Sequence, residues 1–267
     1  MIYFVEGIPA GGKSFYARSL RKKLMQKKDV IYFKEEYKNP IDLLRQAFLT
    51  SAEYENLLID LRNISSEDEY WALFEDIQGS ISTVDNFICI PFMHIKTQNE
   101  TQRKRLDSLY EKELDDGKCT YTEYCNMIIK RIQMFLQEST DDIDYIFEGA
   151  LLHNPLVSIL GFYNVGEAEI VQFYKIVNDI LSTTEYEIHL VCCDNIDKAI
   201  NHAVETRKKN TAFDWEKGFE LWFKQSNNYK TCTGRDGIIS FAKDVFSYEK
   251  LILAKVQFRQ SKIRREV

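Results

Sequence analysis

One run of eight residues near the start of the chain has the composition of a phosphate-binding loop. It reads Gly7-Ile8-Pro9-Ala10-Gly11-Gly12-Lys13-Ser14 and fits the pattern G-x-x-x-x-G-K-[ST]. Glycine lets the backbone turn tightly and bring its N–H groups close to phosphate oxygens. The Lys13 ammonium would face the β- and γ-phosphates, and the Ser14 hydroxyl would bind Mg²⁺. Together with the adjoining Phe15, these residues are the predicted nucleotide-binding set.

The segments on either side of this loop supply the context that the pattern requires. Residues 1–6 are apolar, aromatic and β-branched, which predicts a buried strand. Residues 15–25 place apolar side chains on one helical face and Arg and Lys on the other. This order of strand, loop and helix would aim the positive N-terminal end of the helix at the bound phosphates.

A second candidate group lies at the end of a later apolar run. Residues 144–150 read Asp-Tyr-Ile-Phe-Glu-Gly-Ala, so that Glu148 directly follows the apolar residues 145–147 of a predicted strand. An acid in this place can hold Mg²⁺ beside the phosphate loop, directly or through water. Glu148 could instead be the general base that takes a proton from the attacking hydroxyl. The next loop contains His153 and Asn154, which either contact substrate or form a polar turn before Pro155.

Three more charged residues follow predicted secondary-structure elements. Glu35 and Glu36 come after a strand predicted over 29–34, and ligands of open α/β sheets collect at this end of the strands. These two carboxylates either orient or deprotonate the second substrate, or they lie in a solvated loop. Arg207 ends a helix predicted from Ile196 to Thr206. Its charge would either stabilise the transferring phosphoryl group or complement the helix C-terminus.

The long segment between strands two and three predicts an insertion. Residues 40–140 read as mainly helical, with Asn39 as a cap and Pro40 at the first helical position. A proline interrupts the apolar run over 84–95, which predicts an edge or irregular strand. We expect this insertion to form the acceptor side of the site.

We expect residues 1–267 to form a single domain, which the rest of the chain would complete. Strand four is expected over 187–194, and a fifth strand over 238–241. A terminal helix is expected over 247–264, and residues 200–235 form a lid-like region.

Composition narrows the classes of function. The chain has 267 residues, 45% of them hydrophobic, and a net charge of −6. No basic field therefore favours nucleic acid or an anionic membrane as a partner. No apolar run is long enough to span a membrane, and no signal peptide is recognisable. We expect a cytoplasmic protein, while its oligomeric state stays open.

The first strand and the loop resemble those of the P-loop kinases of the nucleoside and nucleotide kinase group, which includes thymidylate-kinase-like and deoxynucleoside-kinase-like proteins. The resemblance rests on Tyr3-Phe4-Val5-Glu6-Gly7 followed by Gly12-Lys13-Ser14. It implies an α/β three-layer P-loop NTPase fold with a mainly parallel five-stranded sheet. In that group an acid near the end of strand two handles the acceptor, which matches Glu35 or Glu36 in position. The arginine-bearing lid of the group matches Arg207, which follows Val191-Cys192-Cys193-Asp194.

The chain departs from this group after strand three. Glu148-Gly149-Ala150 stands where many thymidylate and deoxynucleoside kinases have an Asp-Arg pair. In outline the chain is also similar to P-loop phosphotransferases that modify hydroxylated antibiotics.

The expected function is therefore transfer of the γ-phosphoryl group of ATP, with Mg²⁺, to a small molecule. The acceptor would be a nucleoside, a nucleotide or a hydroxylated natural product. Lys13, Glu148 and Arg207 would be catalytic, with Glu35 or Glu36 orienting the acceptor, and Ser14 and Glu148 would hold the metal. The alternative is a P-loop ATPase or nucleotide switch that acts with a protein partner.

Overall fold

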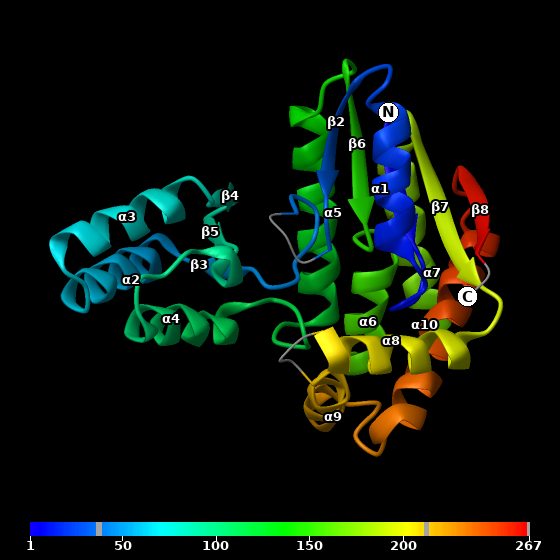
Figure 1. Ribbon diagram of the computed structural model, residues 1–267. Coiled ribbons are helices and arrows are strands. Elements are labelled where there is room, and N and C mark those ends of the chain that lie inside the picture. The colour runs from blue at the N-terminus through cyan, green and yellow to red at the C-terminus, as the bar shows by residue number, and fades with distance from the viewer. Residues whose placement is uncertain (36–38, 211–213, 266–267) are drawn as a thin grey trace.

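A parallel sheet forms the centre of the protein, whose computed structural model describes residues 1–35, 39–210 and 214–265 (Figure 1). The sheet has five strands in the order β2-β6-β1-β7-β8, and every neighbouring pair runs parallel. These strands are β1 (Ile2–Glu6), β2 (Asp29–Phe33), β6 (Ile143–Glu148), β7 (Tyr186–Cys193) and β8 (Gln260–Arg265). The prediction of an α/β protein with a mainly parallel sheet is confirmed.

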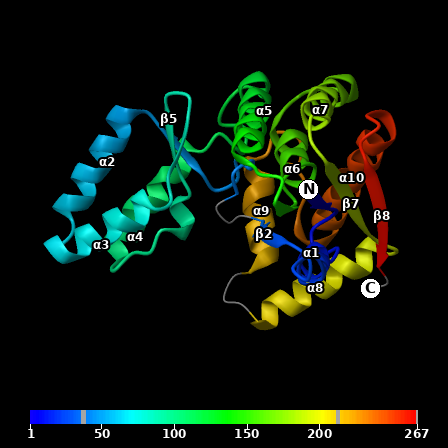
Figure 2. The same ribbon diagram turned by 90° about the horizontal axis from the view of Figure 1, so that it is seen from above.

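Helices cover both faces of this sheet (Figure 2). One face carries α1 (Lys13–Leu24), and the other carries α5 (Tyr121–Glu138), α6 (His153–Phe162), α7 (Glu167–Leu181) and α10 (Gly234–Lys255). Neighbouring residues of β1 point into different layers, because successive side chains of a strand alternate. Val5 packs with Ala17 of α1, whereas Phe4 belongs to the larger core on the opposite face. Both faces of the sheet are therefore covered, as a parallel sheet requires.

The segment between β2 and β6 builds a second, smaller sheet that lies beside α5 (Figure 1). Its antiparallel strands are β3 (Ala47–Leu49), β4 (Ser82–Val84) and β5 (Phe87–Ile90), in the order β3-β5-β4. Besides α5, the helices of this segment are α2 (Ser51–Asn63), α3 (Glu67–Gln78) and α4 (Glu100–Asp107), with short 3₁₀ turns over Phe92–His94 and Ser108–Lys112. They enclose a core of their own that includes Leu57, Leu73 and Ile90.

The helix expected to start at Pro40 is absent. The segment turns instead, because two side chains bond the local backbone: Asn39 Oδ1 accepts from the N–H of Ile41, and Asp42 Oδ1 accepts from the N–H of Leu44. Such bonds compete with helix formation. Ile41 and Leu43, whose spacing suggested a helix, are indeed buried. They lie, however, in an irregular segment that leads into β3.

The edge or irregular strand expected over 84–95 is confirmed as a strand only over Phe87–Ile90, and its expected place at an edge is wrong. The chain forms the β4–β5 hairpin there, and β5 is the central strand of the small sheet. Pro91 stands just after β5 and ends it, which agrees with the missing backbone N–H of proline. The insertion, expected to be mainly helical, therefore also contains a small antiparallel sheet.

At the C-terminus, the strand expected over 238–241 is wrong, and the helix expected over 247–264 is confirmed only as far as Lys255. Residues 238–241 lie inside α10, where Ile238, Phe241, Ala242 and Val245 are buried at helical spacing. The helix ends at Lys255, and the fifth strand is β8. Its sequence, Gln-Ser-Lys-Ile-Arg-Arg, is mostly polar, which is a common property of edge strands.

Two more helices follow β7. These are α8 (Ile196–Asn210) and α9 (Trp215–Gln225), and both lie near the carboxyl ends of the strands (Figure 1). Within the described residues, no helix is both long and apolar enough to cross a membrane.

Candidate functional site

The phosphate-binding pattern occupies the turn between β1 and α1, at the carboxyl edge of the sheet. The strand β1 lies between β6 and β7, and the chain passes from β1 to one side and from β6 to the other. Ligands of open α/β sheets bind at such a switch point. Only glycine fits position 7, because its φ is +134° and a Cβ would lie 2.5 Å from the carbonyl oxygen of Val191.

The first turn of α1 presents uncapped backbone N–H groups. No side chain caps this helix, its N-cap residue is Gly12 in the left-handed region, and its first turn contains no acidic residue. The helix N-terminus thus keeps its partial positive charge for an external anion. This is the arrangement that binds phosphate at a helix start.

Lys13 is buried within the loop that it closes. Its ammonium donates to the carbonyl oxygens of Gly7 at 3.0 Å and Ile8 at 3.3 Å, and lies 3.6 Å from Oε2 of Glu35. Phe15, the last residue of the predicted nucleotide-binding set, is 60% exposed on the first turn of α1. The loop therefore holds a single positive charge at its centre and an exposed aromatic ring at its border.

Ser14 and Glu148, far apart in sequence, meet at this edge. The Ser14 hydroxyl donates to Oε1 of Glu148, and the Tyr32 hydroxyl donates to Oε2. Burial, followed by the Glu148 carboxylate, raises the pKa of Tyr32, so this phenol stays protonated and remains a donor. The contact arises because β6 pairs with β1, which places Glu148 opposite Val5 at the strand end.

These two oxygen donors fit Mg²⁺. No group of three or more His, Cys, Asp or Glu that could hold a metal occurs among the described residues. Mg²⁺ is often bound through only one or two protein oxygens, with water and substrate phosphates completing its shell. Ser14 and Glu148 are the residues that would hold it.

Of the two acids expected after strand two, only Glu35 belongs to the described residues. Glu35 is partly exposed, lies near Lys13, and its Oε1 is 3.8 Å from Nε2 of His153. Glu36 lies outside the described residues. Glu35 therefore lies beside Lys13 and His153, and its role toward the second substrate stays a prediction.

Glu6 fixes the loop that follows β6. Its carboxylate is fully buried and accepts from the backbone N–H groups of Leu151 at 3.0 Å and His153 at 2.8 Å. Burial raises the pKa of Glu6 to about 7, and these backbone bonds oppose the rise. Glu6 thereby sets the position of α6, which begins at His153.

A second buried acid approaches the same place from α10. Glu249 is fully buried, no side chain donates a hydrogen bond to its carboxylate, the backbone of Gly7 lies close to it, and Oε1 lies 3.8 Å from Nδ1 of His153. Burial, followed by the charge of Glu6, raises the pKa of Glu249 to about 8. Burial and then Lys13 lower the pKa of His153 well below its usual value, so the imidazole is neutral.

Asn154 links the site to the insertion. Its Nδ2 donates to Oδ2 of Asp42 at 2.6 Å. A Cβ on Gly149 would lie within 3.5 Å of Glu35, Asn154 and Lys13, which shows that these three side chains converge around Gly149. Asn154 is thus a buried positioning residue, and the polar turn expected before Pro155 is the first turn of α6.

Arg207 packs against the neighbouring helix. Its guanidinium carbon lies 4.2 Å from the ring centre of Trp215, at the start of α9. This cation–π contact joins the end of α8 to α9. The structure brings Lys13, Ser14, Glu35 and Glu148 together, whereas it places Arg207 near the end of α8, against Trp215 of α9.

Sequence reasoning missed Tyr32, Glu6 and Glu249 as members of this site. Glu6 carried a weak signal, because an acid ends a buried strand just before the loop. Tyr32 and Glu249 carried none, since tyrosine is common in strands and Glu249 belongs to an amphipathic helix.

Comparison with known proteins found no match. No family model matches the chain, and no curated protein matches it.

Proposed function

We propose that this protein transfers the γ-phosphoryl group of ATP to a small molecule, as a kinase of the P-loop fold. The observation that carries the proposal is the meeting of Ser14 and Glu148 beside the uncapped start of α1. Phosphate-binding backbone, a lysine and two Mg²⁺-binding oxygens are the parts that phosphoryl transfer requires.

Each residue has a role that follows from its place. The N–H groups at the start of α1 and the Lys13 ammonium would hold the phosphates of the nucleotide. Mg²⁺ would neutralise negative charge on those phosphates, and Tyr32 would keep the Glu148 carboxylate oriented through its hydrogen bond. Glu35 would accept a hydrogen bond from the acceptor hydroxyl near Lys13.

Positioning and charge would supply most of the rate acceleration. The loop is already shaped by Gly7 and Gly12, and the loop after β6 is already held by Glu6. Such prior ordering lowers the cost of reorganisation when the substrates bind. The insertion, which reaches the site through Asp42 and Asn154, would form the acceptor side.

The first test is Lys13→Ala, compared with wild type and with Lys22→Ala. Turnover of Mg²⁺-ATP is measured alone and with nucleosides, nucleotides and hydroxylated antibiotics. Lys13→Ala should lower turnover at least about a hundredfold, because it removes the positive charge beside the transferring group. Lys22 is an exposed lysine of the same helix, so Lys22→Ala should retain wild-type turnover.

The acceptor panel decides between this proposal and its alternative. Phosphate transferred only in the presence of one panel member supports a kinase and identifies its acceptor class. Hydrolysis that is the same with every acceptor would indicate an ATPase or a nucleotide switch with a protein partner. Turnover unchanged in Lys13→Ala would contradict both functions at this site.

A further inference from the structure

The insertion presents an acidic surface around an exposed tryptophan. The helices α2 and α3, with the turn between them, contain eight acidic side chains and one basic side chain. Trp71 of α3 is 49% exposed, and its ring packs beside those of Tyr70 and Phe74, with centroids 5.3 and 5.7 Å away. The exposed Asp68 and Glu75 lie three residues before Trp71 and four residues after it, so they share its face of the helix. We call Asp68, Trp71 and Glu75 the acidic stripe.

The helix α1 presents a surface of the opposite charge. Residues 18–28 contain six basic side chains and no acidic one. Four exposed side chains recur there at spacings of three and four residues, namely Arg18, Arg21, Lys22 and Met25. Met25 is 56% exposed, so an apolar side chain ends this row of cations. We call these four residues the basic stripe.

An exposed tryptophan between carboxylates selects a cationic partner. The face of its ring attracts an arginine or lysine side chain, and the carboxylates at positions 68 and 75 add attraction between opposite charges. Nucleic acids and membranes also contact tryptophan, but these carboxylates repel the phosphates of nucleic acid and of an anionic membrane. A basic protein surface is therefore the occupant that fits the acidic stripe.

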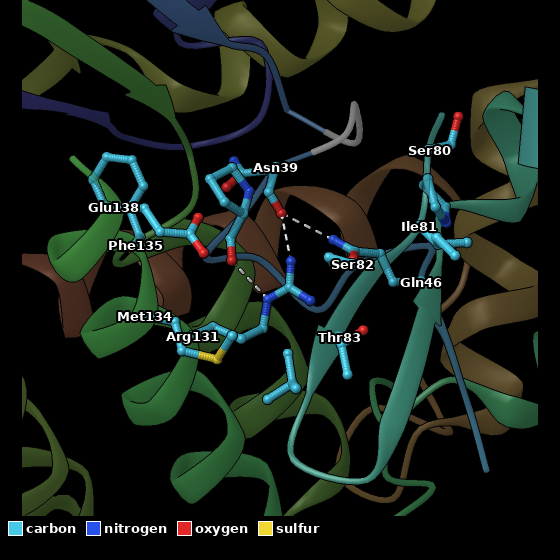
Figure 3. Close-up of a pocket in the computed structure, with 13 residues that line it drawn as sticks. Asn39, Gln46, Ser80, Ile81, Ser82, Thr83, Arg131, Met134, Phe135 and Glu138 are labelled. Carbon is cyan, nitrogen blue, oxygen red and sulfur yellow. Dashed lines mark hydrogen bonds between the residues drawn. The ribbon is translucent and has the colours of Figure 1, made fainter. Parts of the chain in front are cut away.

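The two stripes of one chain lie apart. In both views α3 lies at the outer end of the insertion, away from α1 (Figure 1, Figure 2). The guanidinium of Arg131 on α5 donates at 2.8 Å to each of the carbonyl oxygens of Pro40 and Asn39, at the start of the insertion (Figure 3). Asn154 of α6 donates to Asp42 in the same segment. Because these buried bonds fix the insertion to the main body, the cations for the acidic stripe have to come from another chain.

We propose that this protein self-associates by docking the basic stripe of one copy on the acidic stripe of a second copy. An arginine of the basic stripe would stack on Trp71 between its two carboxylates, and Met25 would cover part of the ring. The two stripes are different surfaces of the chain, so each contact is heterologous. This interaction goes beyond the proposed function and does not depend on it.

The test measures self-association of the full chain by sedimentation at about 0.05 M and about 0.5 M salt. Wild type should associate at low salt, and its association constant should fall at least about tenfold at high salt, because salt screens exposed charges. Arg21→Glu with Lys22→Glu reverses the basic stripe, and Asp68→Lys with Glu75→Lys reverses the acidic stripe. Each reversal should weaken association at low salt at least about tenfold, since like charges then face each other.

A neutral variant keeps the test valid if a charge reversal disturbs folding. Trp71→Ala changes no charge at an exposed position and removes the ring that the cation would contact. It should weaken association at least about threefold. Lys208→Glu with Lys209→Glu is the matched control, because it changes the net charge as much as reversal of the basic stripe does, at exposed positions of α8. This control should associate as wild type does.

A mixture of the two reversed variants tests the pairing itself. Each variant alone carries two stripes of the same sign, whereas the mixture offers complementary stripes between chains, so association should return. Failure of the mixture to associate would mean that the stripes bind other surfaces, and this overturns the proposal. A wild-type chain that stays monomeric at about 0.5 mM and low salt also overturns it. Association that survives reversal of either stripe overturns it as well, whether or not the protein transfers phosphate.

Discussion

Several titratable side chains meet behind the phosphate loop at distances where charge matters. Glu249 of α10 faces Glu6 of β1, Lys13 of α1 and His153 of α6, and Glu35 is close enough to act on its pKa. Two acids with raised pKa values and a neutral imidazole share this interior, with the Lys13 ammonium as their cation. The net charge around the phosphate loop therefore depends on whether these two buried acids hold their protons.

Glu249 makes stability depend on pH. Its pKa rises from 4.5 in the unfolded chain to about 8 in the folded protein. Below the unfolded value both states hold the proton, so its burial is tolerated there. As pH rises from about 4.5 to about 8, the unfolded state loses the proton first, and this contribution to the free energy of unfolding falls.

We therefore expect Glu249→Gln to be more stable than wild type at pH 8, by on the order of a few kcal/mol. At pH 5 the two proteins should differ much less. Urea unfolding at both pH values measures this difference, and the exposed Glu55→Gln serves as control. Equal destabilisation of Glu249→Gln at both pH values would mean that the ionised carboxylate is needed in the folded state.

At the scale of elements, close packing of α6 on α9 joins the sheet to the region near the end of the insertion. Gly161 of α6 lies under Trp222 of α9, and a Cβ there would be 2.6 Å from Cη2 of its ring. Trp222 in turn donates from Nε1 to Oδ1 of Asp116 at 3.0 Å. One glycine thus permits a contact among three segments.

Gly161→Ala should lower the free energy of unfolding by about 1–3 kcal/mol, because overpacking displaces the Trp222 ring. Chemical denaturation gives the free energy, and tryptophan fluorescence reports the displaced ring. Gly79→Ala is the matched control, since a Cβ there comes no closer than 3.4 Å to any atom. If both variants have the same free energy of unfolding, the interface between α6 and α9 can accommodate a methyl group at position 161.

At the scale of the whole molecule, the last described strand closes one side of the sheet. Six residue pairs join β8 to β7, from Ile188↔Gln260 to Cys193↔Arg265. Without β8, the backbone of β7 would become an unpaired edge, and such edges promote association between chains. The C-terminal segment therefore protects a central part of the fold.

Removal of residues 260–267 should lower the free energy of unfolding by on the order of a few kcal/mol and increase self-association. Urea unfolding and sedimentation measure the two effects. A chain that ends at Arg265 keeps all six pairs and should behave as wild type. If the shorter chain matches it in both measurements, β8 contributes little to stability.

The strand, loop and helix at the start could be predicted from sequence alone, because local rules govern them. Alternation and burial indicate β1, and the glycines, Lys13 and Ser14 define the turn. The meeting of Glu148 with Ser14 was also expected, since strands of a parallel sheet end at the same edge.

Only the tertiary structure decided the rest, because it depends on partners distant in sequence. The polar segment of β8 becomes a strand by pairing with β7, and residues 238–241 become helix because their apolar face packs on the core. Likewise, Glu249 and Arg131 look like ordinary residues of amphipathic helices. Burial without a full set of partners makes them notable, and burial is a property of the folded chain.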